Sequence, residues 1–532
     1  MPLLLHHSRD LPAPGAYDTW FAITATPADG LDPKKRLPDL GRRLEQAFDA
    51  IAEDWWRLGK ALGANPSAHW AHAPTAAAYN SDLGLMMAWS HLAADVAGES
   101  RALAVCDDPW LFRHLSDLPG CHAGRPAGMF GAMLRLWARG HLARLRVAAR
   151  VAMAAWRTRH QRQAFGRGDP MIQVYGHPAS TADGFDAYFG NLMAVVPSLR
   201  RLLHTDAPPA RAVSLAKDGR TASLHAWGNV WFALRLVFTR WRPSASEIQG
   251  PWGWLVRRAA AHEGGGGAAA MNRWQMHCQD RWLAAARPTV VAWPWENHPW
   301  ERAFCRTARR LGVATVGYQH AVVGPHQLNA APATNSDGLD SLPDRILCSG
   351  PAYRDQLRRW GIPDDQLSVG GAFRIQRFDG ERYDPKGPVY VPLSAIGPIA
   401  DQMLDAVGKA RRPGRRFLIK DHPLYPHPII ESEDIRRTDR TLPEQQGLSA
   451  VFFATGTPGL EAMLAGVPTI RLLPEDRIAP DVLPDGLSAR SVTVDGFGAA
   501  LDHPPPPPSV PWDSVYADVD MDVWRTVFES TE

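Results

Sequence analysis

The stretch that decides the fold reads Val290-Val-Ala-Trp-Pro-Trp-Glu296-Asn-His298-Pro-Trp-Glu-Arg302, an apolar run that stops at polar, aromatic and turn-forming residues. Two later runs end in the same way, at Lys420-Asp-His422-Pro and at Thr455-Gly-Thr-Pro-Gly459. Side chains at the carboxyl ends of parallel strands point into the crevice where open α/β sheets bind ligands. Three such ends in two halves of the chain therefore predict a cleft between two parallel-sheet domains.

The segments after Val290 alternate between short strands and helices. A helix is expected over 300–311, where Phe304, Ala308 and Leu311 form one apolar stripe. A second unit begins near Asp344, and the strands expected around these elements are 289–293, 313–318, 345–350, 367–371, 388–393, 416–420, 450–454 and 468–473. Such alternation indicates parallel sheets with right-handed crossovers.

The N-terminal half repeats this pattern with longer helical interruptions, and strands are expected at 18–25 and 101–106. We therefore predict an α/β protein of two Rossmann-like parallel-sheet domains that face a cleft, with extra N-terminal helices. The first domain spans 1–335 with a helical insertion at about 118–285, and the second spans 336–502. Residues 503–532 form a proline spacer and a C-terminal helix.

Composition excludes several classes of protein. The net charge of +3 is too small to indicate nucleic acid as a partner. Five cysteines without CxxC spacing argue against a disulfide framework and a structural zinc site. The first residues lack the features of a signal peptide, and no run reaches the roughly 20 apolar residues of a membrane span. We expect a cytoplasmic protein, with peripheral contact at the inner face of the membrane as an open alternative.

The turn after the apolar run 451–453 suits a phosphate. Pro458 fits the first position of a helix, whose free N–H groups and the Thr455 and Thr457 hydroxyls would cradle a phosphate. Glu461, one turn further on, would reach ribose hydroxyls. The alternative is an ordinary capped turn in which Glu461 is favoured only by the helix dipole. Lys420 and His422, at another strand end, would add cationic donors that neutralise a leaving phosphate, although a solvated loop has the same composition.

These motifs, with Cys348-Ser-Gly350 and Val369-Gly-Gly-Ala-Phe-Arg374 before them, resemble the donor half of GT-B nucleotide-sugar glycosyltransferases. Trp295-Glu-Asn-His-Pro and Gly317-Tyr-Gln-His320 are similar to bacterial surface-carbohydrate enzymes that use CMP-activated sugar acids, such as Kdo, nonulosonic acid and sialic-acid-type transferases. The resemblance implies an acceptor-binding first domain and a donor-binding second domain. It assigns the donor nucleotide to Gly350, Arg374, Lys420, His422, Pro423, Thr455, Gly456, Thr457 and Glu461.

Glu296 and His298 are the candidate catalytic residues. A carboxylate beside three tryptophans is expected to have a raised pKa and to act as general base, or as the nucleophile of a retaining double displacement. His320, at the next strand end, would face the same crevice. In the alternative interpretation Glu296 caps the following helix. Asp82 is a second candidate base, although a residue in this setting is more often an ordinary helix cap.

Neither a metal nor a cofactor is expected beyond the nucleotide sugar itself, which is the donor substrate. Asp518-Val-Asp520 matches the metal motif of another glycosyltransferase class but lies in the C-terminal tail. The segment from Leu118 to Gly168 contains arginines and no acidic residue, which favours either a solvated helix or a helix on anionic membrane.

The sequence thus predicts a metal-independent glycosyltransferase of polysaccharide biosynthesis, acting on a bacterial surface polysaccharide or a lipid-linked glycan. The alternatives are a polyol-phosphate transferase of the teichoic-acid type, a sugar-nucleotide epimerase, or a non-catalytic glycan-binding protein.

Overall fold

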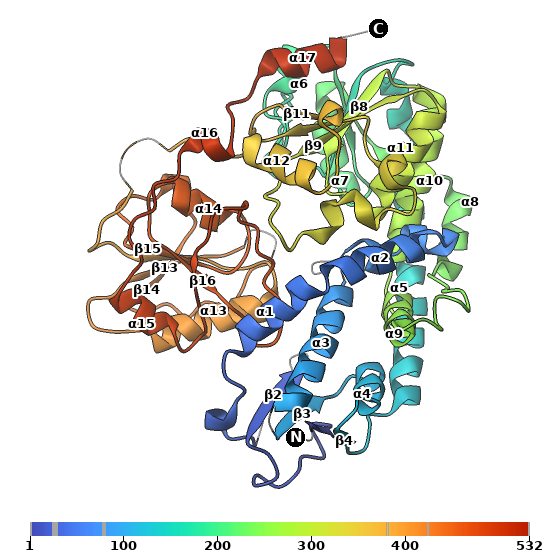
Figure 1. Cartoon of the computed structure of the whole chain (residues 1–532). Coiled ribbons are helices and arrows are strands. Elements are labelled where there is room, and N and C mark those ends of the chain that lie inside the picture. The colour runs from blue at the N-terminus through green and yellow to red at the C-terminus, as the bar shows by residue number, and fades with distance from the viewer. Residues whose placement is uncertain are drawn as a thin grey trace.

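Three β-sheets organise the chain in the computed structural model, which describes residues 3–23, 30–76, 81–99, 101–378, 380, 382–422 and 425–529 (Figure 1). Every strand pair within these sheets is parallel. The expectation of parallel sheets is therefore confirmed. The carboxyl ends of neighbouring strands consequently share one edge in each sheet.

The largest sheet has seven strands in the order β11-β10-β9-β8-β5-β6-β7. The strands are β5 (Met171–Val174), β6 (Arg200–Leu203), β7 (Thr221–Ser223), β8 (Val290–Pro294), β9 (Ala314–Gln319), β10 (Arg345–Cys348) and β11 (Leu367–Val369). One face packs against α5 (Met129–Thr158), α10 (Ala268–Ala286), α11 (Pro299–Arg310) and α12 (Pro351–Arg359). The other packs against α6 (Leu192–Val195), α7 (Pro209–Leu215) and α17 (Met521–Glu529). Both faces are covered, and most residues of these strands are buried.

The C-terminal sheet has six strands in the order β14-β13-β12-β15-β16-β17. The strands are β12 (Val389–Pro392), β13 (Phe417–Lys420), β14 (Ile435–Thr438), β15 (Ala450–Phe453), β16 (Thr469–Leu472) and β17 (Arg490–Val492). Helices α13 (Gly397–Lys409) and α15 (Phe497–Asp502) cover one face. Helix α14 (Thr457–Leu464) packs on the other, next to Tyr390 and Val451.

The N-terminal residues form a third, four-stranded sheet in the order β2-β3-β1-β4. Its strands are β1 (Leu3–His6), β2 (Thr19–Ile23), β3 (Ala102–Cys106) and β4 (Cys121–Ala123), and its helices are α1 (Leu40–Ala50), α2 (Ala52–Gly63), α3 (Leu83–Glu99) and α4 (Pro109–Ser116). Helix α9 (Gly253–Gly264) packs on the same core. Helix α1 reaches the C-terminal sheet, where Glu45 accepts a hydrogen bond of 2.6 Å from Arg471.

The predicted allocation of strands to units is wrong at two places. Strands β10 and β11 were expected to open the second unit, but Arg345–Cys348 pairs with Val316–Gln319 of β9 and so extends the first sheet. The expected helical insertion at 118–285 contains β5, β6 and β7, which complete that sheet. Alternation of strands and helices indicates a parallel sheet, but it does not indicate which sheet a strand joins.

The C-terminal segment returns to the seven-stranded sheet across the molecule, with short α16 (Trp512–Val515) on the way (Figure 1). The Trp524 side chain of α17 is fully buried there, and its indole Nε1 donates to the Gly370 carbonyl at 2.9 Å. The chain therefore joins the two larger sheets twice, once through 370–388 and once through the tail.

Two Rossmann-like parallel-sheet domains that face one another across a cleft define the GT-B fold, and this arrangement is present here with an additional N-terminal sheet. Within the described part of the chain, no helix combines the length and the apolar character needed to cross a bilayer.

Candidate active site in the cleft between the two larger sheets

A cavity of about 370 Å³ lies where the loops of the two larger sheets meet. One wall comes from the loops after β8 and β9, and the other includes the start of α14. The lining residues are Ala76, Trp295, Glu296, His298, Ala321, Val322, Val323, Gln327, Asn329, Ala330, Arg374, Gly456, Thr457 and Val482. Residues predicted from three separate motifs thus meet at one cavity.

The loop after β8 is fixed by the Glu301 carboxylate. Its oxygens accept hydrogen bonds from the backbone N–H groups of Glu296 and His298 and from the Trp293 indole, at 3.0, 3.2 and 3.0 Å. The N-cap residue of α11 is His298, and Glu301 accepts from its N–H as in a capping box. The alternative interpretation, in which Glu296 caps α11, is therefore wrong.

Asn297 makes the loop turn sharply. Its φ of +58° lies in the left-handed region, which asparagine tolerates better than most residues. Its side-chain Nδ2 donates to the Asn329 carbonyl at 2.8 Å, and Asn329 Nδ2 donates back to the Glu296 carbonyl at 2.8 Å. This reciprocal pair holds the Glu296 backbone against the segment after β9.

Two histidines flank the Glu296 carboxylate. His298 Nε2 lies 2.7 Å from Oε2, and His320 Nε2 lies 3.4 Å from Oε1. The Glu296 side chain is 36% exposed, whereas those of His298 and His320 are 16% and 6% exposed. Glu296 is therefore the member of this cluster that is most open to the cavity.

The pKa of Glu296 was expected to be raised, and the structure shows the opposite direction. Burial by itself raises the pKa of this carboxyl, but hydrogen bonds and charges from His298 and His320 outweigh burial, and the pKa lies well below its ordinary value. For His298, burial lowers the pKa, yet the adjacent Glu296 raises it overall. Burial lowers the pKa of His320 despite the same neighbour. Glu296 is an ionised carboxylate at neutral pH.

Arg374 connects this cluster to the other side of the cavity. Its Nη1 donates to His320 Nδ1 at 3.2 Å, which leaves the His320 proton on Nε2, toward Glu296. Its guanidinium also lies over the Tyr188 ring, 5.0 Å from the centroid. The Arg374 side chain is exposed and lines the cavity together with Gly456 and Thr457. It follows the seven-stranded sheet and reaches toward the six-stranded one.

The start of α14 forms the opposite wall. Gly456 has a φ of +96°, a conformation that a side chain would strain. A Cβ atom on Gly459 would lie 2.3 Å from the Phe453 ring, so glycine lets the helix approach β15. Burial raises the pKa of Glu461 to about 7, although the Arg374 charge opposes this shift. The helix start and Thr457 thus present N–H and hydroxyl groups on this side of the cleft, whereas Glu461 does not line the cavity.

Lys420 is the last residue of β13 and His422 follows it, and β13 is separated from β15 only by β12. They therefore share the carboxyl edge with Thr455 but do not line the cavity itself. The His422 ring stacks on Tyr425 at 5.4 Å, and burial lowers the pKa of His422. Pro423, also predicted in this group, lies outside the described residues.

Two of the predicted site residues lie elsewhere. Asp82 accepts two hydrogen bonds of 2.7 Å from Arg258 and does not line the cavity. A Cβ atom on Gly350 would lie 2.1 Å from the Val515 carbonyl oxygen, so this glycine allows the C-terminal tail to pass over α12. Gly350 precedes α12 and follows β10, which pairs with β9, so it stands beside the seven-stranded sheet and not beside the six-stranded one.

Sequence reasoning missed Asn329, Tyr188 and His72. Asn329 and Tyr188 are described above, and the His72 ring packs edge-on against the His298 ring at 6.3 Å. Burial lowers the pKa of His72 to about 4, so it faces His298 as a neutral ring. None of these residues belongs to one of the quoted motifs, and their spacing carries no signal that points to the cleft.

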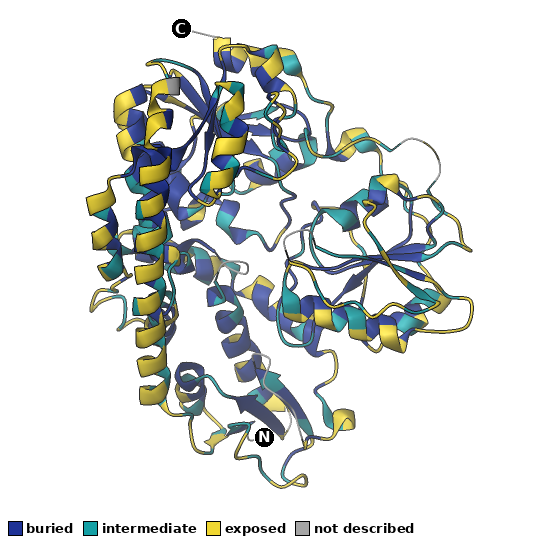
Figure 2. Ribbon diagram, turned by 180° about the vertical axis from the view of Figure 1, so that it is seen from behind, coloured by how far each residue is buried: buried dark blue, intermediate teal, exposed yellow. Residues whose placement is uncertain are grey.

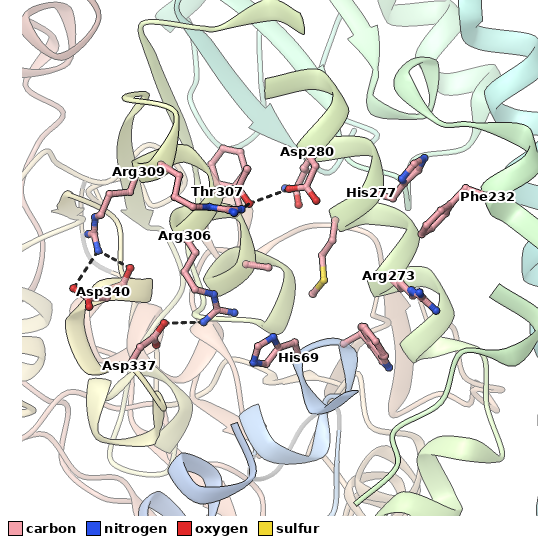
Figure 3. A pocket seen from close by; sticks show the side chains of 16 residues that line it. His69, Phe232, Arg273, His277, Asp280, Arg306, Thr307, Arg309, Asp337 and Asp340 are labelled. Carbon is pink, nitrogen blue, oxygen red and sulfur yellow. Dashed lines mark hydrogen bonds and ion pairs between the residues drawn. The ribbon is translucent and has the colours of Figure 1, made fainter. Parts of the chain in front are cut away.

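A larger cavity of about 830 Å³ lies outside the cleft, along α10 and α11 (Figure 3). Its charged side chains largely engage one another: Arg306 pairs with Asp337 at 2.9 Å, and Thr307 donates to Asp280 at 2.9 Å. His277 stacks on Phe232 with ring centroids 3.8 Å apart. In the Glu296 cluster, by contrast, the carboxylate contacts two histidines. Among the described residues, no group of three or more His, Cys, Asp or Glu side chains is arranged to hold a metal ion.

Comparisons with known proteins give only distant likenesses. No family model matches the sequence, and neither does any curated protein. Among solved structures, the glycotransferase of kitacinnamycin is 11% identical, with 63% of this chain and 90% of that one covered and a TM-score of 0.36. Anabaena HepE in complex with UDP and glucose is 10% identical, with 63% and 89% covered and a TM-score of 0.32. A UDP-N-acetylglucosamine 2-epimerase is 10% identical, with 63% and 87% covered and a TM-score of 0.34. Likeness this distant carries no argument about chemistry, and the fold assignment rests on the sheet topology.

Proposed function

We propose that this protein is a nucleotide-sugar glycosyltransferase that moves a sugar onto a hydroxyl of a glycan acceptor bound beside Glu296. The observation that carries the proposal is the cleft cavity itself, where an ionised carboxylate held by two histidines faces the start of α14 across the Arg374 guanidinium. Ligand sites of open α/β sheets lie at such carboxyl edges.

The donor phosphate belongs on the six-stranded side. The first N–H groups of α14 have no acceptor within the helix, and the helix dipole favours an anion there. The Thr457 hydroxyl lies at the same helix start, and Lys420 and His422 stand at the same sheet edge. These groups would stabilise the charge that develops on the nucleotide phosphate as the sugar leaves. Glu461 would accept from a ribose hydroxyl.

Glu296 acts as the base in this proposal. The acceptor hydroxyl gives its proton to the carboxylate while its oxygen forms a bond to the anomeric carbon. The bond from that carbon to the phosphate oxygen breaks, and its electron pair leaves with the nucleotide. His298 and His320 hold the carboxylate in one orientation, with His298 Nε2 at 2.7 Å and His320 Nε2 at 3.4 Å from its oxygens. The proton taken up by Glu296 passes to water after the products leave. In the alternative, the Glu296 carboxylate itself attacks the anomeric carbon and forms a covalent sugar intermediate.

The proposed donor is a CMP-activated sugar acid such as Kdo or a nonulosonic acid. The sequence resemblance supports this class, and so does Arg374, whose exposed guanidinium lies between the base and the phosphate side. A sugar carboxylate next to the anomeric carbon would pair with a cation at that place. The proposed acceptor is a lipid-linked glycan or a surface polysaccharide.

Nucleotide binding tests the donor proposal. Thermal unfolding of the full chain with CMP, CDP, UDP and GDP should show the largest rise in melting temperature with CMP, because a ligand that binds only the folded state stabilises it. Arg374→Gln should weaken binding of the CMP-sugar acid far more than binding of CMP alone. A larger rise with UDP would contradict the sugar-acid donor, and no rise with any nucleotide would contradict the glycosyltransferase proposal.

A further inference from the structure

Large apolar side chains are exposed to solvent on one surface, which is formed by α5, α8 (Val230–Ala233) and the short helix η7 (Leu234–Phe238). We call it the α5–η7 face. Its exposed apolar residues are Phe130, Met133, Leu134, Trp137, Leu142, Leu145, Met153, Trp156, Val230, Trp231, Leu234 and Phe238. Phe130, Trp231 and Phe238 are 81%, 77% and 71% exposed. Exposed apolar groups gathered in this way mark an interaction surface.

The two parts of this face, α5 and the α8–η7 segment, pack against each other. The exposed apolar side chains therefore stand on a packed part of the molecule. Helix α5 packs along α8 and η7, and the Nε atom of buried Arg144 donates to the Val237 carbonyl at 3.0 Å. On its inner side α5 buries Val151 and Ala155 in the core of the seven-stranded sheet. Figure 2 shows the helix along the outside of the molecule, with exposed residues over much of its length.

The charge around the face is of one sign. No Asp or Glu occurs from Leu118 to Gly168 or from Gly219 to Ser246. Exposed arginines on or next to α5 and η7 are Arg135, Arg139, Arg146, Arg150, Arg157, Arg159, Arg235, Arg240 and Arg242. Two stretches that are far apart in the sequence therefore contribute the same combination of open aromatic groups and cations to one surface.

We infer that the α5–η7 face binds the surface of an anionic lipid bilayer. Apolar and tryptophan side chains would enter the boundary between headgroups and acyl chains, while the arginines pair with lipid phosphates. A second copy of this chain is a poor occupant, because self-association would bring arginines against arginines. This inference is independent of the proposed reaction, although a lipid-linked acceptor would be reached from such a surface.

Vesicle co-sedimentation of the full chain tests the inference. Vesicles of phosphatidylcholine with about 30% phosphatidylglycerol should bind the protein at least roughly tenfold better than phosphatidylcholine alone, because each arginine near an anionic surface adds about fivefold. Raising the salt from about 0.05 to 0.5 M should remove most of this preference, because the Debye length falls below the headgroup spacing. Equal binding to both vesicles, or no binding at low salt, would overturn the inference.

Variants separate the two contributions to binding. The double change Trp231→Ser with Phe238→Ser should lower partition onto anionic vesicles at least roughly tenfold, and Arg146→Glu with Arg157→Glu should do so through charge. Ile430→Ser is the matched control, because Ile430 is 88% exposed but lies in the C-terminal domain. Far-ultraviolet circular dichroism checks that each variant is folded. If the apolar variant bound vesicles normally but lost a dimer seen by light scattering, the occupant would be a second copy.

Discussion

Two carboxylates were candidates for the catalytic base, and the regions around them differ in one instructive way. Asp82 and Glu296 both stand before a helix and both accept hydrogen bonds from basic side chains. The partner of Asp82 is Arg258, which also pairs with Asp108 at 2.6 Å. The partners of Glu296 are histidines, which exchange protons near neutral pH, and its carboxylate opens on a cavity.

The comparison separates an ion pair that holds the fold from one that can handle a proton. Arginine stays charged, so Arg258 connects α3 and α9 but cannot take up a proton from Asp82. Imidazole and carboxylate together can pass a proton between them. The two sites differ in the basic partner of the carboxylate and in its access to a cavity. The choice between Asp and Glu does not separate them.

The largest expected effect comes from Glu296→Gln. The amide keeps the size of the side chain but cannot take the proton, so kcat should fall by roughly 100- to 10,000-fold. Nucleotide binding, measured by the rise in melting temperature with CMP, should not change. Turnover within a factor of two of the unmodified protein would refute the assignment of the base.

Asp82→Asn should act on stability and leave the chemistry intact. Breaking a fully buried pair costs about 3–5 kcal/mol, but the Asp82 side chain is 45% exposed and Asp108 still faces Arg258, so a loss of about 1–2 kcal/mol is expected. Denaturant unfolding measures this loss. A drop in kcat of the folded variant as large as that of Glu296→Gln would remove the contrast between the two regions.

His298→Ala should move the pH profile. His298 lowers the pKa of Glu296, so without it burial dominates and that pKa rises. Activity that requires ionised Glu296 is then lost at a higher pH as the solution is acidified. The acid limb of kcat/KM against pH should shift upward, and His320→Ala should shift it in the same direction. An acid limb that stays in place in both variants would show that another group controls it.

The smallest expected effect is on stability at Glu461. Its pKa is raised to about 7 in the folded protein. The contribution of protonated Glu461 to the free energy of unfolding is therefore fully present below the ordinary carboxyl pKa of 4.5, and it is lost as the pH rises through about 7. Glu461→Gln removes this decline. The difference in melting temperature between pH 6 and pH 8 should therefore be smaller in the variant. An unchanged difference would mean that Glu461 is not the group that titrates.

The sequence alone determined where the strands beside the cleft end, although it did not indicate β5, β6 and β7. Apolar runs that stop at Glu296 and Thr455 identified two sides of the cleft, because strand ends in parallel sheets are local features of the chain. Proline and glycine at Pro458 and Gly456 likewise marked the start of α14. These cleft residues could be recognised from the sequence because they lie in turns at strand ends, where proline, glycine and polar residues are typical.

Only the tertiary structure decided which sheet each strand joins and which charges meet. Strands β10 and β11 follow the same pattern as their neighbours on either side, and pairing with β9 placed them in the seven-stranded sheet. The pKa of Glu296 depends on His320, and the role of Asp82 depends on Arg258, 176 positions away. Strand periodicity is encoded within a few residues, whereas pairing and electrostatics depend on contacts between segments that are distant in the chain.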